Sequence, residues 1–453
     1  MRRLESSITS VRSFEAFPPD FDPSSSSDEL LARLGFPPRP ETSTAMRERW
    51  HQVFSRGLLY VRPQLVERRI DRRLPVGIVR SADGNGTSSN WSGSVVENDR
   101  FNDFVSFRWV EGTWTVPSAY PLQTDGSVYN VSHWVGIDGW LSPDLGQAGV
   151  HTRVSSSGGN LATHSWAWWE WLPADEVEIV NLPITPGDQV RFLVYVHDSV
   201  NGAVPEVTFF AANLSTRVAT WIVRNDLSSL NGDTAEWIVE RPTTNNVLDQ
   251  LPDYGQLFFS EGFASGRAAE GATQDAIVDP TSGMLVVMTD DSGQTISIPS
   301  VAGPDLLRVR FDPGGSLPAT SRFDTVTIAI VTGGDDLRGD SGATATVFAH
   351  GFTAALQQVV LKGYGDASWD NASMRSRTIQ LNTPVPSNGL KSMTITLLQG
   401  GSWPESPDNW NVDGIVVTLE DSTGSNGPVT VLSQTGRPLF RLTGDAPSAE
   451  LTF

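Results

Sequence analysis

One stretch, HSWAWWEWLP at residues 164–173, constrains the fold of this 453-residue chain more than any other. Four of the fifteen tryptophans lie within six of its residues. Read as a β-strand, it places Trp166, Trp168 and Glu170 on one face and the intervening residues on the other. Bulky side chains on both faces predict a central strand. Glu170 then lies either at the wall of a solvated cleft, among tryptophans that shift its pKa, or simply at the edge of a sandwich core.

Strand signals of this kind continue along most of the chain. Short runs of Val, Ile, Thr, Phe and Trp are broken by Gly, Asn, Asp and Pro, with 41 glycines and 29 prolines in all. Such spacing is typical of antiparallel β-sandwiches. The length predicts two or three domains. The chain has 0 cysteines, which excludes disulfides, thiol nucleophiles and thiolate metal sites. No apolar run reaches the roughly 18 residues of a membrane span.

The charge of the chain is unevenly distributed. The formal net charge is −20, yet residues 1–80 hold 14 arginines against 10 acidic residues. The remaining residues therefore carry 18 basic and 42 acidic groups, from totals of 32 and 52. A body this acidic repels nucleic acids and anionic membranes, so neither is expected as a partner. Its self-repulsion weakens as carboxylates protonate, and we therefore expect tolerance of acid.

The first 83 residues differ from the rest and predict a propeptide-like leader. A helix is expected after the capping sequence at 26–29, and a second helix over about residues 44–55. An arginine-rich extended piece follows at 67–73, and residues 81–89 read as a flexible, cleavable linker. The alternative is a docking arm that is never removed.

Two β domains are expected after the leader, over residues 84–300 and 303–453. In the second, Asp335, Asp336, Asp340, Asp408 and Asp413 offer oxygen ligands of the kind that calcium prefers. Aspartates more often cap turns, which is the interpretation we favour. We expect an accessory role in binding or stabilisation for this domain.

The candidate chemistry lies in the middle domain. Gln147 is flanked by small residues in GQAG, and such neighbours let a ligand backbone come close to its amide. Glu236 and Glu240 are four apart on a strand-like run and share a face. A carboxylate that takes a proton from water, beside an amide that stabilises an oxyanion, suits amide hydrolysis.

Six motifs in order resemble the glutamic peptidases, or eqolisins, over roughly residues 88–260. They are SNWSGSV (89–95), TWTVPSA (113–119), WVGIDG (134–139), GQAG (146–149), WAWWEWLP (166–173) and TAEWIVERP (234–242). The resemblance implies a sandwich of two curved antiparallel sheets and an acid-active endopeptidase without metal or cofactor. It does not extend to the C-terminal domain.

The resemblance also assigns roles to individual residues. Gln147 and Glu240 correspond to the catalytic glutamine and glutamate. The substrate-binding positions correspond to Trp134, Asp138, Trp168 and Glu170. Glu236 is expected to be structural. Two departures are the lack of cysteine and GQA in place of the more usual Leu-Gln-Thr.

The family further implies protein or peptide substrates. From the charge and the helical leader we expect a monomer made as a precursor, whose leader lies across the cleft and inhibits it at neutral pH. The family also implies secretion, although no secretory signal is visible in MRRLESSITSVRSFEAF. We expect acid to loosen the basic leader from the acidic body and to permit self-cleavage in the 74–90 region.

Two alternatives compete with the peptidase. The sequence GDSG at 339–342, with His350 nearby, mimics a serine-protease motif but lacks the upstream histidine motif of that family. The tryptophan stretch could instead form a sugar-binding platform, with Glu170 and Glu240 as a glycosidase pair.

Overall fold

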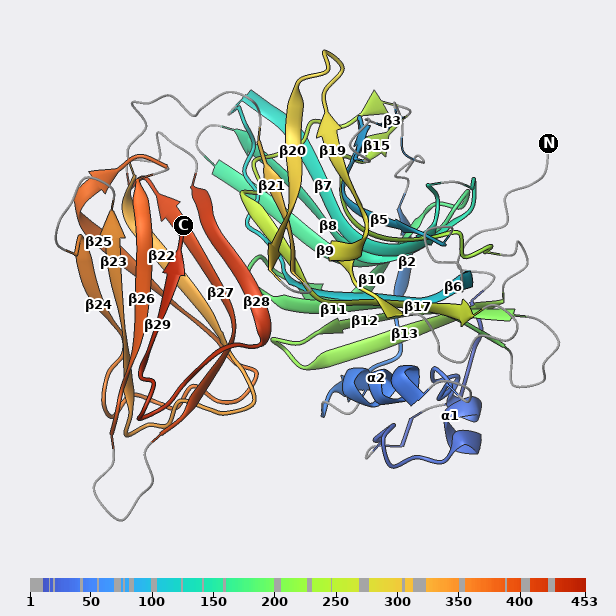
Figure 1. Ribbon diagram of the computed structural model, residues 1–453, viewed down its shortest axis with the longest axis horizontal. Helices are drawn as coiled ribbons and strands as arrows, with labels where there is room; N and C mark the ends of the chain where they lie inside the picture. The colour runs from blue at the N-terminus through green and yellow to red at the C-terminus, as the bar shows by residue number, and fades with distance from the viewer. Residues whose placement is uncertain are drawn as a thin grey trace.

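The computed structural model describes most of the chain, and the helices and strands are shown in Figure 1. The residues outside the description are 1–10, 16, 19–20, 41–43, 55–56, 69–74, 76–77, 81–84, 99–103, 124, 141, 158–159, 199–204, 226–229, 246, 269–276, 304–305, 313–322, 350–354, 388, 401–407 and 423–427. Strands dominate the rest, as the sequence predicts. The all-β prediction is confirmed.

The middle of the chain forms a sandwich of two sheets, which we call sheet A and sheet B. Sheet A has the strand order β1 (Leu59–Tyr60), β13 (Val218–Asn225), β12 (Pro205–Asn213), β11 (Gln189–Asp198), β6 (Phe104–Thr115), β17 (Gln256–Ala268) and β18 (Ile277–Val278). All these pairings are antiparallel except that of β1 with β13.

Sheet B carries the tryptophan stretch. Its order is β2 (Leu65–Arg68), β10 (Glu176–Ile184), β9 (Asn160–Trp171), β8 (Leu145–Ser157), β7 (Asp125–Asp138), β14 (Thr234–Glu240), β5 (Trp91–Glu97) and β19 (Met284–Thr289). Further strands join at β19: β20 (Thr295–Gly303) leads to β21 (Leu306–Phe311), and β4 (Gly86–Ser88) leads to β3 (Val79–Arg80). A short hairpin joins β15 (Thr243–Thr244) to β16 (Val247–Leu248), and a 3₁₀ turn spans Pro280–Ser282.

The strand β17 belongs to both sheets. Its residues 256–259 pair with β21 in sheet B, whereas residues 260–268 pair with β6 in sheet A. Glu261 lies where the pairing changes and has a positive φ of 51°. The ladder thus bends at one residue and carries the chain from one layer to the other.

The sandwich core lies between the two sheets. Trp169 and Trp171 of β9 point into it, together with the buried side chains of Phe192, Phe209 and Val239. Trp166 and Trp168 point to the other face of sheet B and belong to a separate apolar cluster. The alternation predicted for residues 166–171 is therefore confirmed. The central position of this strand is confirmed as well, because β9 lies between β8 and β10.

The leader folds onto the outer face of sheet A. Helix α1 (Asp28–Leu34) begins at Ser27, whose hydroxyl accepts from the Leu30 amide, and ends at Gly35 with φ 63°. Helix α2 (Thr44–Phe54) buries Trp50 and Phe54. Both helices lie below sheet A in Figure 1. The helical part of the leader is thus on the opposite side of the sandwich from Trp166 and Trp168.

The C-terminal domain is a second sandwich with its own core. One sheet has the order β25 (Met374–Val385), β22 (Phe323–Thr332), β27 (Trp410–Glu420) and β28 (Val429–Leu442). The other has the order β24 (Gln357–Lys362), β23 (Gly342–Ala349), β26 (Leu390–Leu398) and β29 (Ser448–Thr452). It lies at the side of the first sandwich, with β28 nearest to it (Figure 1).

Two details differ from the sequence-based expectations. Residues 86–88, expected in a flexible linker, form β4, and both Ser88 and Asn90 are buried. The strand 306–311, assigned to the C-terminal domain, pairs with β20 and β17 and therefore completes the first sandwich. In both cases the segment becomes a strand of the first sandwich because it pairs with a distant segment, and such pairing cannot be read from local composition.

Candidate active site

The candidate residues occupy three rows across one face of sheet B. Directly paired residues of neighbouring strands define each row. The rows are Glu236–Gly136–Gln147–Glu170, then Ile238–Trp134–Gly149–Trp168, then Glu240–Ser132–His151–Trp166. Successive rows are two residues apart, so all the side chains point the same way.

Gln147 is hydrogen-bonded to Glu170 within the first row. Its Nε2 donates to Oε2 of Glu170, and both side chains are buried. The Gln147 Oε1 atom has no hydrogen-bond partner among the residues that the structure describes. An unsatisfied buried acceptor costs free energy, and in native proteins it often marks a functional position.

Glu240 is hydrogen-bonded to a different residue. The indole Nε1 of Trp134 donates to its Oε2 at 2.9 Å, and both side chains are buried. A Cβ built on Gly136 would lie 2.8 Å from Cζ3 of Trp134, so the indole extends over the glycine that neighbours Gln147. Trp134 therefore lies between the rows of Gln147 and Glu240, and the described hydrogen bonds do not join those two residues directly.

Asp138 and Glu236 form a buried acidic pair at the far end of the face. Asp138 has φ 70°, and its carboxylate accepts from the amides of Gly232 at 3.1 Å and Asp233 at 2.7 Å. Burial nevertheless raises the pKa of Asp138 to about 6. Burial first, and the nearby Asp138 charge second, raise the pKa of Glu236 well above its usual value. In acid, both groups are therefore protonated.

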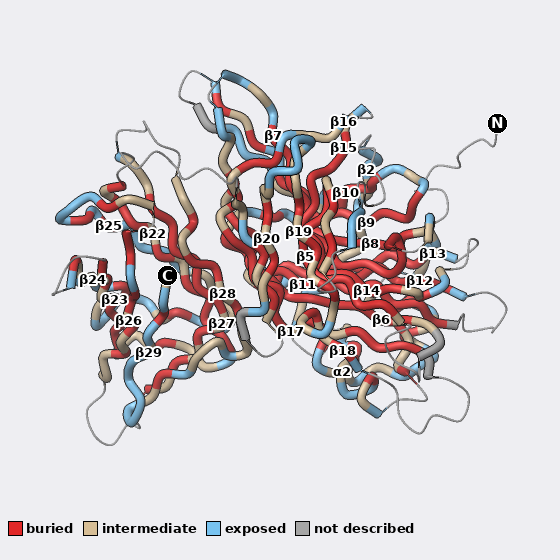
Figure 2. The backbone as a smooth tube through the Cα atoms, turned by 45° about the horizontal axis from the view of Figure 1, so that its top comes forward, coloured by how far each residue is buried: buried red, intermediate tan, exposed pale blue. Residues whose placement is uncertain are grey.

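Tryptophans surround these polar groups. Trp91 packs edge-on against Trp134 at 4.8 Å and lies stacked with Trp140 at 6.3 Å. Trp168 is fully buried, and Met284 and Val286 of β19 belong to the same apolar cluster. The strands around β5 and β14 are red along most of their length in Figure 2. No aromatic platform open to solvent exists on the described part of this face, which disfavours the sugar-binding alternative.

A third group of polar residues was not predicted. Ser132, His151 and Glu176 are buried close together on this face, and Trp166 stacks on the His151 ring with centroids 4.2 Å apart. The signal was present in the sequence, since Ser132 precedes Trp134 by two and His151 follows Gln147 by four. Period two therefore places both on the face already identified.

The serine-protease alternative gains no support from the C-terminal domain. Ser341 is fully buried, and its hydroxyl accepts from the Gly400 amide at 3.4 Å. His350 lies outside the described residues.

The aspartates of this domain contact basic side chains. Asp408 accepts from the Arg338 amide at 3.0 Å and from its Nε at 2.8 Å. The buried Lys362 ammonium donates to the carbonyls of Ser341 at 2.7 Å and Gly339 at 3.3 Å. Within the described ranges no group of three or more His, Asp or Glu could hold a metal ion. For Asp408 the structure thus shows an ion pair with Arg338.

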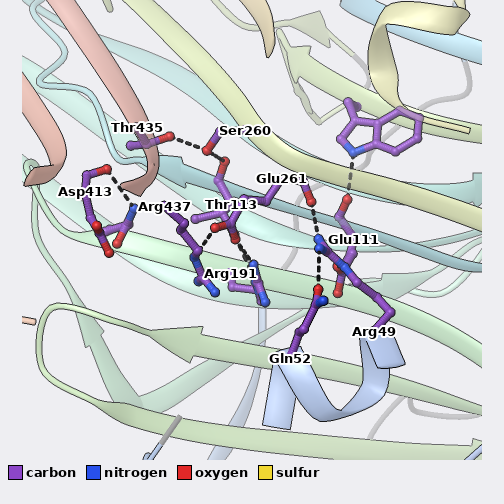
Figure 3. A network of polar contacts seen from close by, with 12 residues as sticks. Arg49, Gln52, Glu111, Thr113, Arg191, Ser260, Glu261, Asp413, Thr435 and Arg437 are labelled. Carbon is purple, nitrogen blue, oxygen red and sulfur yellow. Dashed lines mark hydrogen bonds and ion pairs between the residues drawn. The ribbon is translucent and has the colours of Figure 1, made fainter. Parts of the chain in front are cut away.

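A separate charge network joins the three parts of the chain (Figure 3). Glu261 of β17 forms ion pairs with Arg191 of β11 and with Arg437 of β28, in the C-terminal domain. Arg49 of α2 forms an ion pair with Glu111 and donates to the Glu261 carbonyl. Burial lowers the pKa of Arg191. The network lies on sheet A, so it holds the parts together and does not contribute to the face described above.

Comparisons with known proteins find a family match over the middle of the chain. Residues 89–304 match the model of the Peptidase A4 family. Aspergillopepsin-2 from Aspergillus niger is 27% identical over 237 residues, which are 47% of this chain and 80% of the relative. No helix in the described segments combines the length and apolar character that a membrane span requires.

Solved structures give weaker likenesses. Scytalido-glutamic peptidase with a transition state analog inhibitor is 21% identical with a TM-score of 0.40, covering 49% of this chain and 98% of that one. Aspergilloglutamic peptidase from Aspergillus niger is 26% identical with a TM-score of 0.32, covering 41% and 99%.

Proposed function

Residues 89–304 form a domain of the peptidase A4 family, also called eqolisins, and from this premise we propose that the chain is an acid-active glutamic endopeptidase. Gln147 and Glu240 are its catalytic residues. Trp134, Asp138, Trp168 and Glu170 bind or position the substrate. Proteins and peptides are the substrates, and the chain is made as a precursor.

One observation carries the proposal: an amide and a carboxylate, both buried, project from the same face of sheet B. Gln147 is held by Glu170 and Glu240 by Trp134, so each has a hydrogen bond that fixes its side chain. Since this face has apolar walls, charges on it interact more strongly than they would in water.

In the proposed reaction, Glu240 takes a proton from a water molecule as the oxygen attacks the scissile carbonyl. The carbonyl oxygen becomes an oxyanion, which accepts a hydrogen bond from Nε2 of Gln147. Glu240 then gives the proton to the leaving nitrogen, and the C–N bond breaks to yield an acid and an amine. General-base and oxyanion contributions of about 10²–10⁴ each are ordinary for such groups.

The hydrogen bonds described above set one requirement on this mechanism. Trp134 lies between the two catalytic residues, so one water can be shared only if its indole gives way when a substrate binds. Hydrogen bonds of free enzymes are often rearranged in the substrate complex. An inhibitor-bound structure should therefore show a changed Trp134 rotamer.

Acid activity is proposed from the different environments of the carboxylates. Asp138 and Glu236 have raised pKa values and are neutral in acid. Neither can then serve as a base. Glu240, which accepts a hydrogen bond from Trp134, is the group we assign to that role.

The precursor proposal rests on where the leader contacts the sandwich. β2 pairs with β10 at one side of sheet B, and β3 pairs with β4, which lies beside β19 at the other side. Ion pairs join Arg68 to Glu178 and Arg80 to Glu97. We propose that acid weakens these pairs and that the chain is cleaved in the 74–90 region, with the leader inhibiting the enzyme until then.

The decisive experiment measures cleavage of a denatured protein substrate from pH 2 to pH 8. Glu240→Gln and Gln147→Ala should each lower kcat/KM by about 10²–10⁴ while the fold survives. Glu236→Gln is the matched control on the same strand, because an amide resembles the protonated carboxyl and should leave most activity. Near-normal turnover in either catalytic variant would refute the assignment.

A further inference from the structure

The third row of the face connects Glu240 with a buried histidine. Ser132 pairs directly with Glu240 on one side and with His151 on the other. Directly opposed residues of antiparallel strands have Cβ atoms about 4.5–5.5 Å apart. Ser132 is thus the side chain between the proposed base and the His151 ring, whose Nδ1 lies 3.1 Å from the serine Oγ.

The neighbours of His151 determine which ring nitrogen carries a proton. The Nε2 atom lies 3.0 Å from Oδ1 of Asn130. That amide has a fixed orientation, because its Nδ2 donates to Asp249 at 3.0 Å and its Oδ1 accepts from Nε of Arg153 at 3.0 Å. Oδ1 can only accept, so Nε2 of His151 must donate. The nitrogen that gains and loses a proton is therefore Nδ1.

Among the described residues, the Ser132 hydroxyl and, at 3.6 Å, Oε2 of Glu176 lie beside this Nδ1. Trp166 donates to the other carboxylate oxygen of Glu176 at 2.6 Å and so holds it beside the ring. When Nδ1 is neutral, it accepts the serine proton. When Nδ1 is protonated, it donates, and the Ser132 hydroxyl proton becomes available to another acceptor.

A second nucleophilic centre is a less suitable interpretation of the same residues. A serine–histidine–carboxylate triad needs the serine at one ring nitrogen and the carboxylate at the other. Here Ser132 and Glu176 share Nδ1, and Ser132 is fully buried. The geometry suits a hydroxyl that changes its acceptor and does not suit one that attacks.

We propose that His151 is a positioning residue that acts on Glu240 through Ser132. In acid the imidazolium donates to Ser132, the hydroxyl turns to the Glu240 carboxylate, and Glu240 stays ionised where a solvated glutamate would be protonated. The proposal rests on the function assigned to Glu240 above. It adds the group that sets the lower pH limit of the reaction.

Other charged or titratable groups also face this cluster. Among the described residues these are Glu176, Glu178, Arg68, Arg153, His164 and Asp249. The Glu176 carboxylate offsets the positive charge of the His151 imidazolium. The pKa of Glu240 therefore depends more on the orientation of the Ser132 hydroxyl than on the charge of the imidazolium. Arg68 and Arg153 lie 5.8 Å from the Trp166 ring and remain charged throughout the relevant range.

The first experiment needs no catalysis. The full-length protein, labelled at its 6 histidines, is titrated by NMR from pH 3 to pH 8, and the His151 signal is assigned with His151→Gln. Coupling between two sites is reciprocal, so Glu240→Gln and Ser132→Ala should each lower the His151 pKa by about 0.5–1 unit. A His151 ring that does not titrate, or that is unaffected by Glu240→Gln, overturns the proposal even if no peptidase activity is found.

The second experiment measures the acid limb of kcat/KM, which reports the pKa of the essential base. His151→Gln keeps a donor for Asn130 but cannot become charged. This variant should raise the pH midpoint of the acid limb by about 0.5–1 unit. At pH 3 its kcat/KM should therefore fall by roughly threefold to tenfold, whereas the plateau value at higher pH should change little. Ser132→Ala should do the same.

A matched control lies on the other sheet. His197 is also buried, and its Nε2 lies 2.8 Å from the Thr208 hydroxyl. His197→Gln should leave the acid limb unchanged. Equal shifts in the His151 and His197 variants, or none in either, would show that His151 has a structural role only.

Discussion

The two outer faces of the sandwich are both rich in aromatic residues, yet they differ in what lies between the rings. On sheet A, Trp109, Phe210 and Trp221 meet the leader's Phe36 and Phe54. Two buried charges on this sheet, on Glu111 and Arg191, are in ion pairs. On sheet B, the row that holds Trp134 and Trp168 lies between the row of Gln147 and the row of Glu240. A large aromatic surface alone therefore does not identify a site. The kind of polar group buried beside it is the better indication: ion pairs on sheet A, and an amide and carboxylates on sheet B.

The leader satisfies some of the indole groups that face it. On sheet A, the Trp221 indole donates to the Gly35 carbonyl, and the Trp50 indole donates to the Pro37 carbonyl at 3.0 Å. In the described part of the chain, both faces also have buried polar atoms without a hydrogen-bond partner: Nε1 of Trp109 and Oε2 of Glu111 on sheet A, and Oε1 of Gln147 on sheet B. We expect the leader face to contribute most to stability, and the unsatisfied acceptor of Gln147 fits the catalytic role proposed for that residue.

The largest effect on stability should come from the leader face. Trp50→Ala removes a fully buried ring from the cluster on sheet A and should lower the free energy of unfolding of the full-length protein by about 3–5 kcal/mol. Chemical denaturation with fluorescence detection measures this. A decrease in the free energy of unfolding below about 1 kcal/mol would mean that the leader adds little to stability. It would contradict the contrast between the two faces.

A smaller effect on stability, which depends on pH, should come from Asp138 of sheet B. The folded pKa of Asp138, about 6, exceeds the reference value of 3.8, so the folded state binds the proton more tightly. Ionisation of the buried Asp138 carboxyl therefore destabilises the folded protein. This destabilisation is present in full above pH 6 and disappears as the pH falls below about 4. It amounts to about 3 kcal/mol at 1.36 kcal/mol per unit.

Asp138→Asn tests this, since asparagine tolerates the positive φ of the position. Melting temperatures from pH 4 to pH 7 should vary less in the variant than in the natural protein. An unchanged pH dependence would exclude Asp138 as its source.

The smallest effect is expected for Glu236→Gln. In acid the glutamate is already neutral, because burial raises its pKa, and stability should change by less than about 1 kcal/mol. Above neutrality the variant should be the more stable protein, as its side chain cannot ionise. Strong destabilisation at pH 4 would show that this carboxyl is a structural acceptor of the ordinary kind.

Sequence patterns predicted well which face of a strand each side chain occupies. They predicted poorly which residues of neighbouring strands lie side by side in a row. Alternation assigned Trp166 and Trp168 to one face and Trp169 to the other, because period two is local. It could not show that Gln147 shares a row with Glu236 and that Glu240 shares one with Ser132. Row positions depend on the register between strands far apart in sequence.

The same limit applies to the parts outside the sandwich. Both leader helices were predicted from caps and periodicity, but their location on sheet A was not. The motifs matched the peptidase A4 family, and the comparisons confirm that resemblance. Lys362, whose ammonium lies among carbonyls near the C-terminal aspartates, gave no signal, since a single lysine carries no pattern.

The strand shared by the two sheets has a consequence for how an added domain can matter. Arg437 and Thr435 of the C-terminal sandwich attach at Glu261 and Ser260, the residues where β17 leaves one layer for the other. The C-terminal domain is therefore attached to the first sandwich at the point where its two sheets join. Loss of the Glu261–Arg437 ion pair would therefore remove a contact of the C-terminal domain and, at the same residue, a contact of the strand that both sheets share.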